Sequence, residues 1–288
     1  MRLLEVIFMT ILICGGDERN VILARLLAQA GHKVLCYCLD CVPTPEGCTA
    51  VGAPDKCDAV ILPVPAEAGR GLLNAPLGTA PCRIEHILDC AGEGAMVIGG
   101  KLGTQLVSAA RERGQTVHDY MLMPEFTAKN AAITAEGAVS ELMKMSNTAL
   151  CDMRILVIGW GRIGKLLIKK LGALCTNVCL LSRNPEARAL ASELGCRALP
   201  PDCPAALLGS FDAVINTAPA PVVPELCAFK DGCMLFELAS APGGLDKSEA
   251  DRRLTVLRAL PGKYAPESAA RAVFSAVSEI IKERDKYE

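Results

Sequence analysis

The stretch VIGWGRIGKLLIKKLGALCTNVCLLSRN, residues 157–184, decides the fold. Gly159, Gly161 and Gly164 form a GxGxxG motif that follows a strand-like apolar run and opens a helix-like one. In such a turn the first glycine allows tight curvature, the second admits a pyrophosphate, and the third lets helix and strand pack closely. Helix N-termini favour anions, so the stretch predicts a dinucleotide site. The residues expected to line it are Gly159, Trp160, Gly161, Arg162, Ile163 and Gly164.

The end of the second strand in this unit indicates which dinucleotide is bound. An acidic residue there would accept hydrogen bonds from the ribose hydroxyls and would repel a 2′-phosphate. The sequence instead has Ser182, Arg183 and Asn184. Because arginine binds phosphate through two charge-assisted hydrogen bonds, we predict NADP(H) rather than NAD(H). The alternative is that Arg183 is an ordinary solvated loop residue.

Two further loops are expected beside the cofactor, since both follow predicted strands. NTAP (216–219) follows the fourth strand of this half, and ELASAPGG (237–244) follows the fifth. Asn, Pro and Gly are also common turn residues, so ordinary turn chemistry is the alternative. The candidate cofactor contacts in these loops are Asn216, Thr217, Pro219, Ala239 and Ser240.

Strand and helix signals alternate along both halves of the chain. The apolar strand-like runs lie at 10–16, 33–39, 58–65, 95–99 and 116–120, then at 153–159, 177–182, 196–199, 212–219, 233–240 and 254–260. Helical patterns lie at 18–31, 81–91, 103–113, 162–173, 185–195, around Ala205, at 246–253 and at 266–288. Continuous apolar strands with helices between them are typical of parallel sheets covered on both faces.

The alternation predicts an α/β protein with two doubly wound, Rossmann-like domains joined by two long helices. We expect an N-terminal substrate domain (1–133), a linking helix (134–150), an NADP-binding domain (151–265) and a C-terminal helix (266–288) that packs back toward the N-terminal domain. Ligands of such folds bind at the carboxyl ends of the strands.

Composition excludes several functional classes. The net charge of −2, the absence of a basic tract and the 4% aromatic content argue against nucleic-acid binding. The opening MRLLEVIFMTILIC resembles a signal peptide, but its run into GGDERN favours a first buried strand, and Met9 is a possible start. No later stretch has the ~20 apolar residues of a membrane span, so we expect a cytoplasmic protein.

The 15 cysteines are scattered, and many lie in apolar strand-like runs. The tightest group is Cys36, Cys38, Cys41 and Cys48. Cys36 and Cys38 are expected to share one face of a strand, but no CxxC pair or nearby histidine completes a zinc site. We therefore predict reduced, buried thiols and no metal.

Histidine chemistry is scarce in the predicted nucleotide domain. The histidines are His32, His86 and His118, whereas a hydroxy-acid dehydrogenase normally uses a histidine to take the hydroxyl proton. Only His118 is a candidate to approach a cleft. A hydride transfer that needs little acid–base help fits these residues better.

Several segments resemble one known family. GGDERN (15–20), ILPVPA (61–66), NAAITAEGA (130–138) and ELASAPGGLD (237–246), with GWGRIG, LLSRN and NTAP, are similar to segments of the A subunit of dipicolinate synthase. The match runs in order over nearly the whole chain. The resemblance implies NADP-dependent oxidation of dihydrodipicolinate, or its hydroxy-tetrahydro precursor, in sporulation, together with a flavoprotein-like B subunit. A homo-oligomer is also expected.

The resemblance also implies a substrate site for a small dicarboxylate. Gly15 and Gly16 are expected to present backbone N–H groups to it, and Asp17 and Arg19 to handle a proton and a carboxylate; the alternative for the latter two is a helix cap and a solvated charge. Asp17 is the only catalytic candidate. The expected substrate-binding residues are Gly15, Gly16, Asp17, Arg19, Pro63, Val64, Lys101 and Asn130.

Two segments depart from the family pattern. LRALPGKYAPESAA (257–270) places Arg258, Lys263 and Tyr264 in a proline- and glycine-rich stretch, and the cysteine-rich loop 36–57 has no family counterpart. The open alternatives are a dehydrogenase of another small carboxylate and a nucleotide-binding regulatory protein without turnover.

Overall fold

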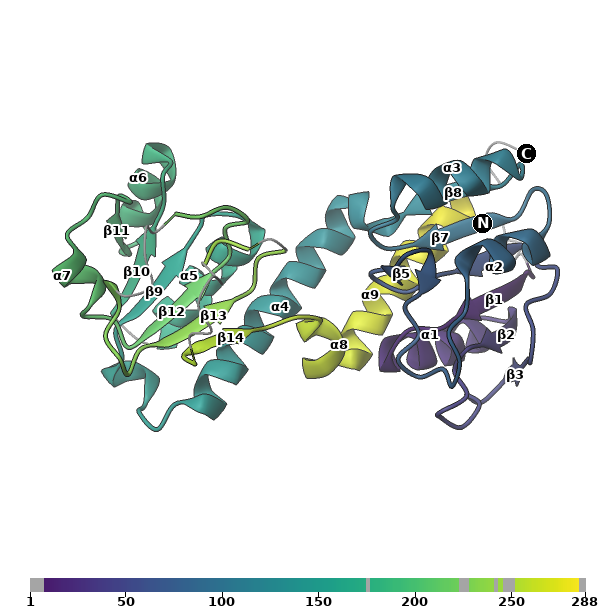
Figure 1. Ribbon diagram of the computed structural model, residues 1–288, viewed down its shortest axis with the longest axis horizontal. Coiled ribbons are helices and arrows are strands. Elements are labelled where there is room, and N and C mark those ends of the chain that lie inside the picture. Colours follow the sequence, from purple (N-terminus) through teal and green to yellow (C-terminus); the bar gives the residue numbers. More distant parts are fainter. Residues whose placement is uncertain (1–7, 175–176, 223–227, 241–242, 246–251, 285–288) are drawn as a thin grey trace, which may run out of the picture. The chain divides into compact units, whose positions relative to one another are not determined.

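The computed structural model describes residues 8–174, 177–222, 228–240, 243–245 and 252–284. The chain divides into two compact units (Figure 1). Unit 1 comprises Met1–Asn130 with Ala265–Glu288, and unit 2 comprises Ala131–Tyr264. Each unit contains a six-stranded parallel sheet with helices, which confirms the predicted pair of doubly wound α/β domains.

The sheet of unit 1 has the order β3-β2-β1-β4-β7-β8. Its strand order reverses between β1 and β4, which is where ligands of doubly wound sheets bind. A short antiparallel pair, β5 (Glu67–Gly69) and β6 (Leu72–Leu73), follows β4. The strands of the parallel sheet are β1 (Thr10–Cys14), β2 (Lys33–Tyr37), β3 (Cys48–Ala50), β4 (Ala59–Ile61), β7 (Met96–Gly99) and β8 (Thr116–Asp119).

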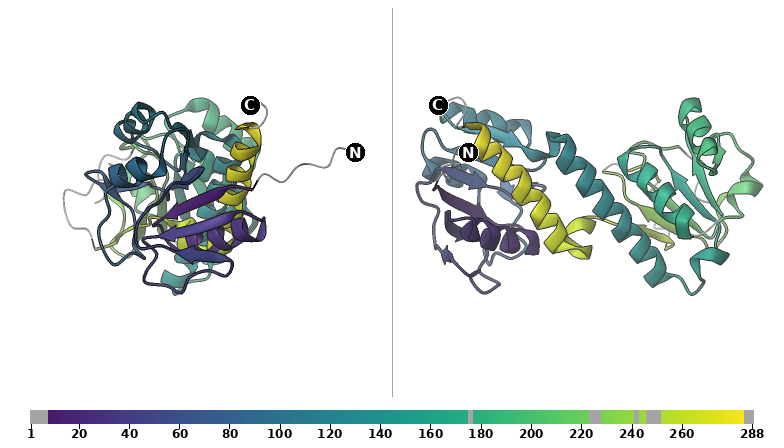
Figure 2. Two further views of the ribbon diagram at one scale, coloured as in Figure 1. Left: turned by 90° about the vertical axis from the view of Figure 1, so that its right-hand side faces the viewer. Right: turned by 180° about the vertical axis from the view of Figure 1, so that it is seen from behind.

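The helices of unit 1 come from both ends of the chain. The C-terminal helix α9 (Pro266–Arg284) packs beside α1 (Glu18–Gln29), as the two views in Figure 2 show. Val273 and Val277 of α9 share one buried cluster with Leu23 and Leu27 of α1. Unit 1 also contains the helices α2 (Ile84–Ala91) and α3 (Thr104–Glu112) and the short 3₁₀ turn η1 (Tyr120–Leu122).

Unit 2 repeats the plan with the order β11-β10-β9-β12-β13-β14. The switch point lies between β9 and β12. The strands are β9 (Ile155–Ile158), β10 (Val178–Leu181), β11 (Arg197–Leu199), β12 (Ala213–Asn216), β13 (Met234–Glu237) and β14 (Leu254–Val256). The helices are α5 (Arg162–Leu174), α6 (Pro185–Glu193), α7 (Ala205–Leu208) and α8 (Leu260–Tyr264), with a 3₁₀ turn η2 (Leu150–Asp152). The helix predicted at 246–253 falls almost wholly outside the described residues.

The predicted linking helix has different bounds in the structure. Helix α4 spans Pro124–Met145 rather than 134–150, so it begins in unit 1 and ends in unit 2. Proline suits a first helical turn because its missing N–H would have no partner there. At the other end, the Ser146 hydroxyl bonds the backbone N–H of Thr148 at 2.9 Å and its carbonyl oxygen at 2.8 Å, and such local bonds compete with the helix.

Apolar strands are buried on both faces because successive side chains point in opposite directions. In unit 2, Ile155 and Val157 enter one buried cluster, while Leu156 and Ile158 enter the other. The strands of unit 1 alternate in the same way. This two-sided burial is the physical reason that the strands appear in the sequence as unbroken apolar runs.

The cysteine-rich loop differs from its prediction in two ways. It contains the edge strand β3, and Cys36 and Cys38 do not share a face, since β2 ends at Tyr37 and Cys38 adopts a left-handed φ of 56°. Cys36 and Cys38 lie in separate buried clusters. Burial raises the pKa of both thiols to about 12, which makes them poor nucleophiles. Within the described residues, no group of His, Cys, Asp or Glu side chains has the arrangement of a metal site.

None of the described helices is both long and apolar enough to cross a membrane.

Candidate functional site

The three glycines of the turn after β9 differ in why they are needed. A Cβ on Gly164 would lie 2.1 Å from the carbonyl oxygen of Gly159, and Gly159 itself has a φ of 98°. These two glycines are therefore required by the chain's own packing. A Cβ on Gly161 would have no heavy atom within 4 Å. The fold does not require Gly161, and the open space beside it fits a ligand that approaches the backbone closely.

One side of the turn is hydrogen-bonded to the neighbouring strand β10, and the other side is exposed to solvent. The N–H of Gly159 donates to the carbonyl oxygen of Leu181 at 3.0 Å, while Gly161 and Arg162 are exposed at the start of α5. Trp160 and Ile163 are half-buried against the core of unit 2. Since the first N–H groups of a helix have no partner within the helix, this end of α5 can bind an anion.

The loop after β10 uses two of its three predicted cofactor residues internally. The buried hydroxyl of Ser182 accepts from the N–H of Asn184 at 3.3 Å. The Asn184 side chain caps α6, accepting from Glu186 N at 2.9 Å and Ala187 N at 3.5 Å. Arg183 is exposed. Of the three side chains, Arg183 is the one available for a phosphate.

The structure adds Arg188, a residue that the sequence reasoning missed. Its Nη1 donates to the carbonyl oxygens of Ser182 at 2.8 Å and Arg183 at 3.0 Å. Arg188 lies near the start of α6, so it fixes the carbonyl groups of the peptide bonds before and after Arg183. A basic residue one turn into the helix that follows the second strand was the available signal.

The loop after β12 lies against the glycine turn. The N–H and hydroxyl of Thr217 both donate to the carbonyl oxygen of Ile158, at 2.8 and 2.9 Å. A Cβ on Gly159 would lie 2.7 Å from the Thr217 hydroxyl oxygen. Pro219 is exposed. The structure therefore brings Thr217 into the predicted site and leaves Pro219 at its surface.

The expected role of Asn216 needs correction. It is 1% exposed, and its amide nitrogen donates to Ala218 O at 3.0 Å and to both carboxylate oxygens of Glu237 at 2.9 Å. Its amide oxygen accepts from Ala218 N at 3.1 Å. Asn216 thus holds loops together instead of facing a ligand, because its polar atoms already have partners inside the protein.

Glu237 is a second residue of this region that was not among the expected site residues. It is fully buried and accepts from the N–H of Ala239 at 2.8 Å and from those of Gly244 and Leu245 at 2.9 Å. Ala239 is therefore tied down by its N–H, and Ser240 is exposed. A glutamate at the end of an apolar strand was the signal, since a buried carboxylate needs a dedicated set of donors.

In unit 1, the turn after β1 does not present its N–H groups as expected. The N–H of Gly15 donates to Tyr37 O at 2.8 Å, and that of Gly16 donates to Asn74 O at 2.9 Å. The prediction that these groups face a ligand is wrong, because both are used to hold neighbouring loops. A Cβ on Gly16 would lie 2.1 Å from the side chain of Asn20, so this glycine is needed for packing.

Asp17 and Arg19 form a two-bond ion pair at the same edge. Asp17 caps α1 through the N–H of Arg19 at 3.1 Å, and its two oxygens accept from Arg19 Nε and Nη2 at 2.8 Å each. Arg19 Nη2 also donates to Val64 O at 3.1 Å. Arg19 is 7% exposed, whereas the side chain of Asp17 keeps 31% exposure. Asp17 therefore caps α1, and the Arg19 guanidinium is fixed by Asp17 and Val64 O instead of being solvated.

The remaining candidates of unit 1 follow β4, β7 and the start of α4. Pro63 and Val64 follow β4, and the carbonyl oxygen of Pro63 accepts from Gly100 N at 3.4 Å. The backbone of Lys101 is fixed by Asp119 Oδ1 at 3.1 Å, while its side chain is exposed. Asn130 lies on α4 and is the last residue of the first segment of unit 1. The structure thus gathers all of them except Asn130 at the carboxyl ends of the strands.

The turn after β1, the Asp17–Arg19 pair and the Val64 contact fall within one matched region. Residues 10–121 match the family model of the N-terminal domain of the dipicolinate synthase A subunit. The resemblance to this family that the sequence suggested is thereby confirmed.

Solved structures of the dipicolinate synthase A subunit have the same fold as the whole chain. The A chain of dipicolinate synthase from Bacillus subtilis has a TM-score of 0.83 and 22% identity, covering 98% of each chain. The A subunit from Bacillus halodurans also has a TM-score of 0.83, with 24% identity over 94% of this chain and 97% of that one.

A curated relative matches part of the chain. Glutamyl-tRNA reductase of Deinococcus radiodurans is 27% identical over 197 residues, or 61% of this chain. The match spans 55% of that relative, about half of its length.

His118 lies within the region that matches the dipicolinate synthase family model, on β8. Burial lowers its pKa, and Glu283 offsets this only in part. The ring is half-buried and interacts with Glu283 of α9, so His118 lies in a structural environment of unit 1.

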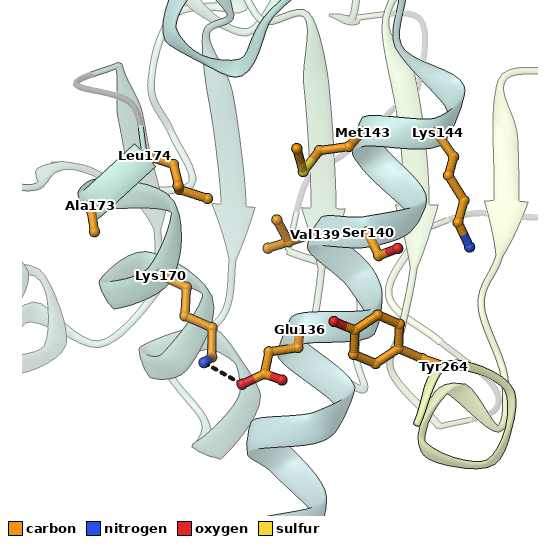
Figure 3. A pocket seen from close by; sticks show the side chains of 9 residues that line it. All are labelled: Glu136, Val139, Ser140, Met143, Lys144, Lys170, Ala173, Leu174 and Tyr264. Atoms are coloured by element: carbon orange, nitrogen blue, oxygen red, sulfur yellow. Dashed lines mark hydrogen bonds and ion pairs between the residues drawn. The ribbon is translucent and has the colours of Figure 1, made fainter. Parts of the chain in front are cut away.

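A groove of about 640 Å³ lies in unit 2, between α4 and α5 (Figure 3). Val139 and Met143 of α4 face Leu174 of α5 across it. Glu136 lies within α4 and pairs with Lys170 at 2.7 Å. The groove was not predicted, because its walls come from helices whose packing the sequence does not specify.

Proposed function

We propose that this chain is the A subunit of dipicolinate synthase, an oxidoreductase that uses NADP to oxidise dihydrodipicolinate, or its hydroxy-tetrahydro precursor, to dipicolinate in sporulation. One combination carries the proposal: the N-terminal domain of this family in the same chain as a glycine turn with open space at Gly161. The dinucleotide site supports redox chemistry, and the N-terminal domain supports this family's substrate.

Unit 2 would hold the cofactor. The space beside Gly161 admits a pyrophosphate, the N-terminus of α5 offers N–H groups to it, and exposed Arg183 is available for a 2′-phosphate. Arg188 fixes the loop from which Arg183 projects. When bound, NADP⁺ would supply an acceptor for the hydride that a dihydropyridine loses as its ring becomes aromatic.

Unit 1 would bind the dicarboxylate. Lys101 offers an exposed ammonium group, and Arg19 offers a guanidinium held by Asp17 and Val64 O. Asp17 is the candidate for proton handling, since its side chain is partly exposed. Aromatisation provides much of the driving force, so the residues need chiefly to bind and orient the substrate.

The partners follow from the same proposal. A flavoprotein-like B subunit would complete the synthase. The 15 cysteines, whose described members include several buried thiols, fit a reducing cytoplasm.

The decisive assay combines the purified chain with NADP⁺ and freshly generated dihydrodipicolinate, with and without the B subunit, and follows dipicolinate absorbance. Product that depends on this chain is the expected result. Dinucleotide binding without product would contradict the proposed substrate and favour a different carboxylate or a regulatory role.

A matched pair of glycine variants tests the cofactor site. Gly161→Ala and Gly172→Ala each add a methyl group to open space, one in the turn and one within α5. Gly161→Ala should lose dinucleotide affinity with little change in stability. Gly172→Ala should keep its affinity and gain up to ~1 kcal/mol of helix stability. Equal affinity in both would refute a pyrophosphate at Gly161.

A homo-oligomer is the remaining part of the proposal. Met143, Met145 and Leu174 are exposed at 57%, 47% and 53%, which is unusual for large apolar side chains on neighbouring helices. We expect Met143→Lys to lower the molar mass measured by sedimentation. A monomeric unchanged chain would contradict self-association.

A further inference from the structure

Glu237 lies at the centre of a buried hydrogen-bond network in unit 2. It ends β13 with no exposed surface, and its carboxylate accepts from three backbone N–H groups of the following loop, those of Ala239, Gly244 and Leu245. It also accepts from the side-chain amide of Asn216 at the end of the neighbouring strand β12. A single carboxylate therefore joins the loops after two strands.

The network continues from Asn216 to the glycine turn. The next residue, Thr217, bonds the carbonyl oxygen of Ile158 through both its N–H and its hydroxyl. Ile158 directly precedes Gly159, and a Cβ on Gly159 would touch the Thr217 hydroxyl. The carboxyl ends of β9, β12 and β13 are thus linked by an unbroken series of contacts.

The loops are packed too closely for ordinary side chains. A Cβ on Gly244 would lie 2.5 Å from Ala218 O and 2.7 Å from the amide nitrogen of Asn216. A Cβ on Gly243 would lie 2.9 Å from a carboxylate oxygen of Glu237. Gly243 and Gly244 therefore lie in close contact with Glu237, Asn216 and Ala218.

A buried carboxylate is an energetically unfavourable way to link two loops. Burying it is unfavourable unless hydrogen bonds replace its water shell. Its described donors are backbone N–H groups and one amide, and these donors fix the direction of each bond. A fully hydrogen-bonded network of this kind fixes the positions of the loops. A ligand site requires fixed loops, and a hydrophobic contact would define their positions less strictly.

We infer that Glu237 is a positioning residue for the dinucleotide: it holds the loops after β12 and β13 in register with the glycine turn. This inference rests on the proposed dinucleotide binding. Glu237 has no exposed surface, so it would act on the dinucleotide only through the residues that it bonds.

The test compares dinucleotide affinity in folded variants by calorimetry with NADP⁺. Glu237→Gln keeps the size of the side chain but turns an acceptor into a donor that opposes N–H groups. We expect the Kd for NADP⁺ to rise about tenfold or more. If this variant does not fold, Glu237→Asp keeps the charge, retracts it by one methylene, and should weaken binding in the same direction.

Asp212→Asn is the matched control. Asp212 precedes β12 at the opposite edge of the sheet and accepts from Arg154 N at 2.7 Å, so its loss should lower the Tm and leave the Kd unchanged. The double variant Asn216→Asp with Glu237→Gln restores a donor–acceptor pair and should recover part of the affinity lost in Glu237→Gln.

The outcomes separate the two proposals. If the unchanged chain binds no dinucleotide, both the proposed function and this inference fail. If it binds NADP⁺ and the folded Glu237 variants bind equally well, the positioning role alone is overturned. The positioning role also fails if Asp212→Asn weakens binding as much as they do.

Discussion

The side-chain amide of Asn216 donates to both carboxylate oxygens of Glu237 at 2.9 Å, and the two residues end adjacent parallel strands. Asn216→Ala removes this donor and leaves the buried carboxylate with fewer partners. We expect the free energy of unfolding to fall by ~1–3 kcal/mol, measured by urea denaturation. Ser240→Ala, at an exposed position of the same edge, should stay within ~0.5 kcal/mol. Equal stability of the two variants would show that the pair contributes little.

Gly164→Ala should be strongly destabilising even without a ligand. Its new methyl group would meet the carbonyl oxygen of Gly159 at 2.1 Å, and neither backbone can move far within the turn. We expect a loss of ~1–3 kcal/mol or more, as in other overpacked sites, measured by thermal unfolding. An unchanged Tm would mean that the start of α5 relaxes away from β9.

Arg183→Asp should change cofactor preference without changing stability. Arg183 is exposed, so its replacement should shift the free energy of unfolding by no more than ~0.5 kcal/mol. The introduced carboxylate should repel a 2′-phosphate and accept hydrogen bonds from the ribose hydroxyls. The affinity for NADPH should therefore fall relative to that for NADH. Parallel titrations with both dinucleotides measure this ratio. A constant ratio would contradict the assignment of NADP.

Asp212 should make stability depend on pH in the acid range. Partial burial alone would raise the pKa of Asp212, but hydrogen bonds from Lys230 and Arg154 N–H hold it below its ordinary value of 3.8. The folded chain therefore binds this proton less readily than the unfolded chain. The stabilisation is present above pH 3.8 and is lost as the pH falls through the folded value.

Asp212→Asn is the direct check on that pH dependence. The variant should be less stable than the unchanged chain at neutral pH, and the difference should shrink on acidification. Denaturation series at several pH values measure it. A difference that stays constant with pH would show that the ionised form of Asp212 is not favoured by folding.

His32 should make the folded chain less stable as the pH falls, whereas a histidine paired with a carboxylate would make it more stable. Burial lowers its pKa from 6.5, and its Nδ1 is buried with no hydrogen-bond partner in the described part of the chain. The unfolded chain therefore binds the proton more readily, so stability falls as the pH drops below 6.5. His32→Gln should reduce this loss between about pH 7 and 5. An identical pH profile for the variant would contradict the burial effect.

The sheets could be predicted from sequence because their signals are local. Runs such as ILVI at 155–158 and VCLL at 178–181 are apolar on both faces, and the glycine turn follows one of them directly. The strand β3 escaped prediction because three residues at an exposed edge carry no apolar pattern. The start of α4 was also missed: the helix begins ten residues before the segment that was expected to link the domains.

The site was harder to predict because its partners are distant in sequence. Ser182, Arg183 and Asn184 look alike as polar loop residues, yet only the folded chain shows that the first and third are used internally. Glu237 depends on Asn216, which lies 21 positions earlier, and no local pattern announces that pair. Such pairing is a property of strand neighbours rather than of neighbouring residues.

Unit 1 is built from two segments separated by the whole of unit 2. The apolar side of α1 is covered by α9, whose residues leave the ribosome only after those of unit 2. During synthesis the first segment must therefore wait with part of its core open, while residues 131–264 form a continuous piece that can complete its sheet earlier. The buried cluster that α1 shares with α9 can therefore be completed only after residues 131–264 have been synthesised.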